Sequence, residues 1–243
     1  EAGCTVIRAA PPEWLADIHR KDWLYAQLGD LLPLPPFEVV ESVDAAAAVV
    51  HRLEADGAMP CLKPCVSVYG HGFYRIRDES PVYPFDLSLA DWIAQQGSEP
   101  LAPHLVMAYL PGTEYSVDVA AEHGRVLALS TRRKGEHNIQ ELIHHPALAE
   151  LTVGAVERLR LNGLSNFQFK EDQSGKACFL EINPRASGGI GMACAGGINL
   201  PAVAYRPYLA PGSTEVVGQP TSLPVRVTEI PMARRFPQAI CEA

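Results

Sequence analysis

The chain has 243 residues, of which 47% are hydrophobic and 20% are charged, and its formal net charge is −8. This composition is typical of a globular protein in water and excludes a disordered chain, and the longest small apolar run, AAAAVV at 45–50, is too short to cross a membrane. The negative charge excludes a nucleic acid as the main partner, because nucleic-acid binding depends on phosphate neutralisation by lysine and arginine, and it leaves anionic small molecules open.

The N-terminal part of the chain alternates helical patterns with short strand patterns. Apolar residues recur at helical spacing in the expected helices, and serine stands at two expected N-caps. Prolines mark a loop that enters a strand at 32–40, and glycines separate two β-rich runs within 59–77. The helices are expected at 12–29, at 42–57 after Ser42, and near 88–96 after Ser88.

The C-terminal part of the chain predicts mostly strands. Residues 104–134 predict three strands with turns at LPGT and EHG, and residues 165–183 have the form of a hairpin. Between them a helix is expected over 146–162, with Pro146 in its first turn. Because no repeat or low-complexity linker interrupts these elements, the prediction is an α+β protein with antiparallel sheets in at least two lobes.

Six cysteines are scattered along the chain, and several of them lie in apolar stretches. This pattern indicates buried, reduced thiols of a cytoplasmic protein and does not suggest a disulfide framework. The closest pair, in CLKPC at 61–65, has a spacing unlike the usual zinc knuckle and has no matching second pair.

The hairpin can be built geometrically from its turn. A symmetric turn at DQSG (172–175) places Gln168 across from Phe179 and Asn166 across from Glu181. Gln168 and Glu181 are then diagonal neighbours on one face, roughly 7–8 Å apart at the backbone. The opposite face is expected to carry the apolar side chains of Phe167, Phe169, Leu180 and Ile182.

One face of this hairpin therefore carries three oxygen donors with a single formal negative charge, namely Gln168, Glu181 and Asn183. Mg²⁺ takes hard oxygen ligands in near-octahedral geometry, usually one or two carboxylates together with the phosphates of a nucleotide. Phosphates would have to supply the remaining charge, and Arg185 follows closely enough to pair with two of their oxygens. The alternative is a solvated strand face beside a loop arginine.

A second basic group lies in an unusual setting. Lys63 stands in the strand-like apolar run PCLKPCVSV, where lysine is rarely buried without a partner. The segment SVYGHGFYR (67–75) follows, and the backbone N–H groups of its glycine loop could close over phosphates, although it is not a Walker loop. The alternative is an ordinary hairpin turn.

Five segments of the chain follow one another in the order and spacing of a known superfamily. They are RKDWLYAQL around Lys21, CLKPCVSVYGHGF around Lys63, YLPGTEYSVDV at 109–119, GLSNFQF at 163–169 and FLEINPRASGG at 179–189. Together they resemble the ATP-grasp superfamily, and most of all its carbamoyl-phosphate-synthase-like branch of carboxylate–amine ligases. The resemblance covers the chain from about residue 20 to 205.

The resemblance implies that ATP lies between two α+β lobes with antiparallel sheets. Lys21 and Lys63 would hold its phosphates under a glycine-rich flap formed by Tyr69, Gly70, Gly72 and Phe73. The remaining implied contacts are the backbone of Tyr109 and Leu110 with the adenine, Glu114 with the ribose hydroxyls, Gln168, Glu181 and Asn183 with the metal, and Arg185 with the triphosphate.

The implied activity is ATP-dependent activation of a carboxylate as an acyl phosphate, which an amine-type nucleophile then attacks. The cofactors would be ATP and Mg²⁺, with Mn²⁺ as the alternative ion, and Lys63 and Arg185 would be the catalytic residues. The expected partners are a small-molecule carboxylate and amine, and further a second copy of the chain or an upstream domain or subunit. Neither a nucleic acid nor a membrane is expected.

The resemblance also implies a division of the chain. The expected parts are a linker or helix from an upstream domain at 1–20, a first lobe at 21–108, a second lobe at 109–210 and an extension at 211–243. Relatives carry a further N-terminal domain that helps to form the acceptor site, and they commonly have glutamate where this chain has Ala108.

Two other hypotheses stand beside the ligase. The chain could be a nucleotide-binding module without its own catalytic activity, or an α+β protein whose hairpin face only binds a divalent cation. The basic segment STRRK (130–134) either lines the acceptor pocket or is solvated at the end of its strand.

Overall fold

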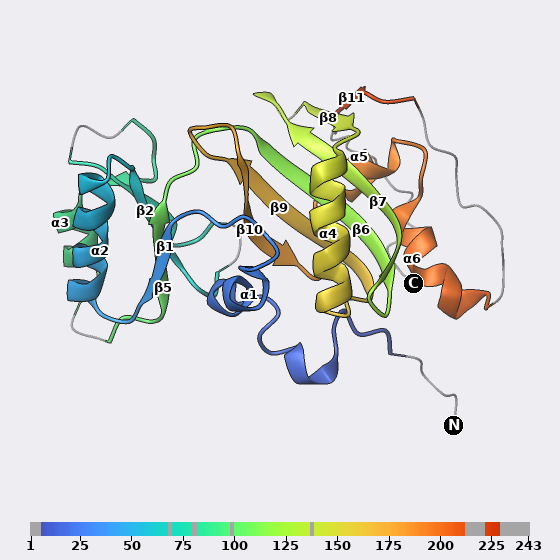
Figure 1. Cartoon of the computed structure of the whole chain (residues 1–243), viewed down its shortest axis with the longest axis horizontal. Helices are drawn as coiled ribbons and strands as arrows, with labels where there is room; N and C mark the ends of the chain where they lie inside the picture. The colour runs from blue at the N-terminus through green and yellow to red at the C-terminus, as the bar shows by residue number, and fades with distance from the viewer. Residues whose placement is uncertain are drawn as a thin grey trace, which may run out of the picture.

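The computed structural model describes residues 6–67, 70–78, 82–97, 100–136, 139–211 and 222–228. Within these ranges the chain forms a five-stranded and a six-stranded sheet that lie side by side with helices packed on them (Figure 1). The predicted α+β class with antiparallel sheets in two lobes is confirmed. No helix in the described ranges is long and apolar enough to span a membrane.

The smaller sheet has the strand order β1-β5-β2-β3-β4, and all its pairs are antiparallel except β3 with β4. Two helices cover one face, where apolar side chains of α2, such as Val50, pack with Trp92 of α3 and Leu62 of β2. The bounds are β1 Phe37–Val40, α2 Val43–Ala55, β2 Pro60–Pro64, β3 Tyr74–Ile76, β4 Asp86–Leu87, α3 Leu89–Gln95 and β5 His104–Ala108.

The larger sheet has the order β10-β9-β6-β7-β8-β11 and is antiparallel throughout. Because side chains alternate along a strand, Val117 and Val119 enter the core under α4, whereas Ala120 packs with α5 and α6 on the other face. The bounds are β6 Glu114–Glu122, β7 Arg125–Lys134, β8 Gln140–Ile143, α4 Pro146–Arg158, β9 Gly163–Glu171, β10 Ala177–Asn183, α5 Ile190–Cys194, α6 Leu200–Leu209 and β11 Val225–Val227.

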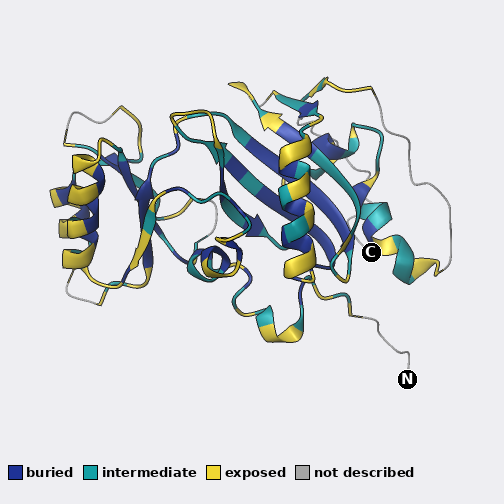
Figure 2. Cartoon of the chain, in the orientation of Figure 1, coloured by how far each residue is buried: buried dark blue, intermediate teal, exposed yellow. Residues whose placement is uncertain are grey.

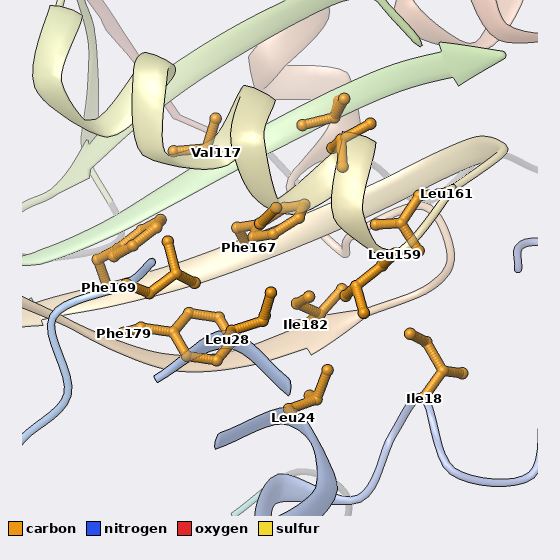
Figure 3. Close-up of a cluster of buried hydrophobic side chains, with 14 of the residues drawn as sticks. Ile18, Leu24, Leu28, Val117, Leu159, Leu161, Phe167, Phe169, Phe179 and Ile182 are labelled. Atoms are coloured by element: carbon orange, nitrogen blue, oxygen red, sulfur yellow. The ribbon is translucent and has the colours of Figure 1, made fainter. Parts of the chain in front are cut away.

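The helix α1 (Lys21–Leu28) packs against the larger sheet. Figure 3 shows Leu24 and Leu28 beside Phe179 and Ile182 of the sheet. The expected division at 21–108 groups this helix with the smaller sheet, and that division stays a prediction. In Figure 2 the strands are mostly buried, whereas the outer faces of the helices that pack on them are exposed.

The helices agree with the predictions where a cap is local in sequence. The Ser42 side chain accepts a hydrogen bond from the Ala45 N–H, and Ser88 caps α3 in the same way. The helix expected over 12–29 is wrong as one element, because only a 3-10 turn at Pro12–Trp14 and α1 form there. The helix expected over 146–162 ends at Arg158, since Arg160 adopts a positive φ of 47°.

The hairpin of β9 and β10 forms as predicted, but its register differs. Glu171 pairs with Ala177, and a bulge between Phe179 and Glu181 then places Gln168 directly opposite Glu181. The predicted diagonal arrangement of these two residues is therefore wrong. The bulge also turns Leu180 away from the core that Phe179 and Ile182 enter, and the predicted apolar face is wrong at this residue.

The bulge is held by a residue that is distant in sequence. The hydroxyl of Tyr25 in α1 donates to the carbonyl oxygens of Phe179 at 3.1 Å and Leu180 at 3.3 Å. A bulge interrupts the ladder of backbone hydrogen bonds, so a buried donor at this place stabilises the interruption.

The cysteines in the described residues are free, and three of them are buried. They are Cys61, Cys65 and Cys178, with Cys194 partly exposed, whereas Cys4 and Cys241 lie outside the described residues.

Candidate active site

A cavity of about 440 Å³ lies between the two sheets and has the size of a small-molecule binding site. Its walls combine side chains from β2, β5, β6, β7, β9 and β10 with α1 and the loops between them. The lining residues are Lys21, Cys61, Lys63, Ser67, Gly70, Phe73, Phe85, Met107, Tyr109, Leu110, Glu114, Lys134, Gln168, Lys170, Leu180, Glu181, Asn183 and Arg185.

The cavity brings together all but two of the residues proposed from the sequence. Gly72 does not line it; instead its Cα lies so close to the Pro64 ring that a Cβ would come within 2.7 Å of that ring, and its φ of 76° also favours glycine. Tyr69 lies outside the described residues.

The oxygen donors of the hairpin meet at one end of the cavity. Gln168 and Glu181 face one another across the strands, and the Asn183 amide donates to Glu181 Oε1 at 3.2 Å. Arg185 Nη2 donates to Asn183 Oδ1 at 3.4 Å, so the guanidinium extends this polar row. In the described residues no group of three or more His, Cys, Asp and Glu side chains is placed to hold a metal. A cation here would need oxygen ligands from elsewhere to complete its shell.

Two buried lysines approach the same end, Lys21 from α1 and Lys63 from β2 of the smaller sheet. Lys21 begins α1, and its Nζ lies 3.2 Å from Ser67 Oγ and 3.5 Å from Glu181 Oε2. Lys63 lies on β2 with its Nζ 5.7 Å from the centre of the Tyr25 ring. Burial lowers the pKa of Lys63 from 10.5 to about 8. Both ammonium groups are thus held in the site at a desolvation cost.

The other end of the cavity is apolar and partly aromatic. Met107, Leu110 and Leu180 pack there with Cys61, and the rings of Phe73 and Tyr109 lie 6.5 Å apart. A planar apolar ligand fits such walls, because they offer area and stacking faces. The backbone N–H of Tyr109 already donates to the Met59 carbonyl at 2.7 Å, so this group is not free to donate to a ligand.

The aromatic wall is fixed by a buried ion pair. Arg75 makes two bonds to Asp86, at 2.6 and 2.8 Å, and its guanidinium lies 5.1 Å from the Phe85 ring and 5.0 Å from the Tyr109 ring. The hydrogen bonds from Arg75 lower the pKa of Asp86 to about 2. The Asp86 carboxylate also accepts the N–H group of Val82, so the loop that carries Phe85 is held from two sides.

The charge of the cavity is opposite to that of the chain. Five basic side chains line it against two acidic ones, whereas the chain has a net charge of −8. The acidic pair is Glu114, which forms an ion pair with Lys134, and Glu181. A positively charged cavity in a negatively charged protein concentrates the electrostatic field at the cavity, and this field favours a polyanionic ligand.

The comparisons with known proteins follow this geometry. A family model described as "ATP-grasp in the biosynthetic pathway with Ter operon" matches residues 101–231, which is more than half of the chain. The chain belongs to this ATP-grasp family. No curated protein matches it.

Solved structures of ATP-grasp proteins share the fold at low sequence identity. A PurK N5-carboxyaminoimidazole ribonucleotide synthetase with ADP has a TM-score of 0.61 at 17% identity, over 87% of this chain and 56% of its own. The ligase PsnB in complex with its minimal precursor, Mg and ADP has a TM-score of 0.59 at 22% identity, over 80% of this chain and 59% of its own. An L-amino acid ligase from Bacillus licheniformis has a TM-score of 0.57 at 17% identity, over 81% of this chain and 48% of its own. The chain thus spans about half the length of these proteins.

Sequence reasoning missed several residues that line this ATP-grasp cavity. Lys170 shares the predicted hairpin face with Gln168, and Lys134 ends the STRRK segment, so both had a signal in the sequence. No pattern in the sequence marked Leu180, because only the bulge turns its side chain to the cavity. The other missed residues are Cys61, Ser67, Phe85 and Met107.

The STRRK segment contains three different environments. Arg132 is buried and binds Asp118 at 2.8 Å, Gln140, and Ser187 at 3.1 Å. Arg133 is exposed, and Lys134 faces the cavity. The expectation of solvated basic residues is therefore wrong for Arg132.

Proposed function

We propose that this chain is the ATP-binding and catalytic module of an ATP- and Mg²⁺-dependent ligase, which activates a carboxylate as an acyl phosphate for attack by an amine-type nucleophile. The observation that carries the proposal is the polarity of the cavity of about 440 Å³ between the sheets. An apolar, aromatic end fits a nucleobase, and the end with Lys21, Lys63 and Arg185 fits a triphosphate.

The residues divide along the bound nucleotide. The adenine would lie against Phe73, Phe85 and Tyr109, with the backbone of Leu110 at its polar edge. Glu114 would accept the ribose hydroxyls midway along the cavity. Lys21, Lys63 and Arg185 would bind the phosphates, under the loop that contains Gly70 and is proposed as the flap.

The donor set of Gln168, Glu181 and Asn183 fits Mg²⁺ bound together with phosphate. It offers oxygen ligands only and one formal charge, which matches an ion that shares its shell with a nucleotide. Bound there, Mg²⁺ would neutralise charge on the terminal phosphates, and Mn²⁺ could take its place. The Asn183 side-chain oxygen, which accepts a hydrogen bond from Arg185 Nη2 at 3.4 Å, would be the atom that contacts the ion.

The proposed reaction has two steps. An oxygen of the substrate carboxylate attacks the γ-phosphorus, the bond to the bridging oxygen of ADP breaks, and an acyl phosphate forms. The amine nitrogen then attacks the acyl carbon, inorganic phosphate leaves, and the nitrogen loses a proton. The contribution of Lys63 and Arg185 is to place the γ-phosphate and to offset the negative charge that spreads over it.

Two measurements test this proposal. Mg·ATP should raise the melting temperature of the protein more than Mg²⁺ alone, and an equal effect of both would remove nucleotide binding as the function. On the full-length protein, hydroxylamine trapping with a pool of carboxylic metabolites should give substrate-dependent ADP and hydroxamate. No hydroxamate across a broad pool would contradict the ligase.

The substitution Glu181→Gln tests the metal site directly. We expect turnover to fall at least a hundredfold, because the site loses its one carboxylate near the phosphates, while the unfolding transition stays within about 1 kcal/mol of wild type. Glu38→Gln is the matched control, since this exposed glutamate of β1 lies outside the cavity and pairs with Arg52 of α2. A Glu181→Gln variant with full activity would sink the metal assignment.

The second candidate is a nucleotide-binding module without its own chemistry. It is favoured by Ala108, whose side chain packs into the core of the smaller sheet and gives no polar group to a base. In that case Mg·ATP would stabilise the protein and trapping would yield nothing. The carbamoyl-phosphate-synthase-like branch, the division at 21–108 and 109–210, a cytoplasmic location and a partner copy or domain stay parts of the proposal.

A further inference from the structure

A carboxylate just outside the cavity holds the strand that carries Glu114. Glu171 is the last residue of β9, and it does not line the cavity. We propose that Glu171 is a positioning residue, which together with Tyr115 sets the place of the Glu114 carboxylate and thereby the recognition of the ribose. The inference rests on the proposed role of Glu114 and adds a specificity function to two residues beside it.

The side chain of Glu171 binds the residues on both sides of Glu114. Its Oε2 accepts the backbone N–H of Thr113 at 3.1 Å, and its Oε1 accepts the hydroxyl of Tyr115 at 2.7 Å. The Tyr115 hydrogen bond lowers the pKa of Glu171, and burial raises the pKa of Tyr115, so the carboxylate is ionised and the phenol donates.

The backbone of Glu171 binds the same turn. Its carbonyl accepts the N–H of Gly112 at 3.0 Å, and its N–H donates to the Thr113 carbonyl at 2.9 Å. A Cβ at Gly112 would lie 2.6 Å from the Glu171 Cβ, so only glycine permits this approach. Side chain and backbone of one residue thus hold Gly112, Thr113 and Tyr115.

Because side chains alternate along β6, these contacts with the neighbouring residues also set the direction of the Glu114 side chain. Tyr115 is buried in the core of the larger sheet, and the neighbouring Glu114 therefore points to the other side, where it lines the cavity. There it pairs with Lys134 and lies opposite Lys170 in the register of β6 and β9. Loss of the Glu171 contacts would free the start of β6, and with it the Glu114 carboxylate.

Nucleotide binding tests the inference without knowledge of the acceptor substrate. The dissociation constants of Mg·ATP and Mg·2′-deoxy-ATP are measured for wild type, Tyr115→Phe, Glu171→Gln and Glu114→Ala, and for Glu114→Ala combined with Tyr115→Phe. Tyr115→Phe keeps the packed ring and removes one hydroxyl, so it should fold if Glu171→Gln does not. Ser174→Ala is the control, since it removes a hydrogen bond to Asp172 in the turn that follows β9.

Wild type should bind Mg·ATP on the order of tenfold more tightly than the deoxy analogue, as expected for one hydrogen bond to a charged group. Tyr115→Phe and Glu171→Gln should lose about half of this preference or more by weaker binding of ATP, and Ser174→Ala should keep it. Tyr115→Phe should have no further effect once Glu114 is alanine.

The contrary outcomes are distinguishable. Wild type with measurable ATP binding and no preference would overturn the ribose role of Glu114, and with it this inference. A wild-type preference that survives in both variants would overturn only the positioning role. Equal weakening of both nucleotides in the variants would show a general structural role instead.

Discussion

Four lysine or arginine side chains are buried in the described part of the chain, and they are of two kinds. Arg75 and Arg132 form short hydrogen bonds to a buried carboxylate of the scaffold, whereas Lys21 and Lys63 do not. Arg75 forms a two-bond pair with Asp86, and Arg132 binds Asp118 and the side chains of two further residues. The planar guanidinium offers several donors in a fixed fork, which suits a permanent place in a scaffold.

The lysines face the cavity with bonding capacity left over. Lys21 reaches Ser67 and, less closely, Glu181, and within the described residues Lys63 has neither a hydrogen bond nor an ion pair. A buried ammonium group is costly unless something pairs with it. Burial of charge alone therefore does not distinguish the cavity from the scaffold, whereas the two lysines with bonding capacity left over both line the cavity. The phosphates of the proposed ligand would supply the pairing.

The largest effect that tests this comparison is expected at Arg132. Arg132→Met should lower the free energy of unfolding by about 3–5 kcal/mol, because it leaves the Asp118 carboxylate buried without its cation. Urea unfolding measures this change. The substitution should also weaken nucleotide binding, since Arg132 holds Ser187 in the loop that follows Arg185.

The next residue provides the control. Arg133 pairs with Glu141 on the surface, with 51% of its side chain exposed, so Arg133→Met should cost less than about 1 kcal/mol. Equal costs at the two positions would mean that Arg132 is no more a part of the scaffold than its neighbour.

Lys63→Met should change stability in the opposite direction. The shift of its pKa from 10.5 to about 8 corresponds to a burial cost of about 3 kcal/mol, which an apolar side chain of similar length would avoid. We expect the free protein to become more stable by at most this amount and to lose most of the stabilisation by Mg·ATP. A marked loss of stability in the free variant would show that Lys63 belongs to the scaffold.

The sequence predicts those parts of the molecule that are determined locally. The caps at Ser42 and Ser88 are set by residues three positions apart, and the hairpin face with Gln168, Glu181 and Asn183 follows from strand alternation. These features need no knowledge of the rest of the fold. Both lobes and the oxygen-donor face of the candidate site could therefore be expected from local patterns, whereas Lys21, Tyr109, Leu110 and Glu114 were expected only from the resemblance to the ATP-grasp superfamily.

What the sequence did not predict depends on contacts across the fold. The bulge at Leu180 is stabilised by the hydroxyl of Tyr25, which is 155 positions away in the sequence. The burial of Arg132 depends on Asp118 in the neighbouring strand and on Gly189, where a Cβ would come within 2.2 Å of the guanidinium. No periodicity within a strand contains this information, so neither the place of Leu180 nor the role of Arg132 followed from the pattern.

The smallest expected effect is a pH dependence of the stability of the free protein and of its affinity for Mg·ATP. The two quantities change in opposite directions with pH, and both changes come from Lys63. Between pH 8 and 10.5 the unfolded chain keeps the lysine proton and the folded chain has lost it, so the stability of the free protein should rise with pH. Phosphate binding needs the ammonium form, so the affinity for Mg·ATP should fall above about pH 8, by up to tenfold per pH unit.

Calorimetry with a non-hydrolysable ATP analogue and urea unfolding, both from pH 7 to 9.5, measure the two slopes. The neighbouring thiol of Cys61 stays protonated in this range, because burial raises its pKa to about 12. Lys63→Met should flatten the contribution of this group to both curves, which makes it the matched control. If the variant keeps the wild-type slope in nucleotide affinity, another group titrates there, and Lys63 is not the unsaturated cation that distinguishes the site from the scaffold.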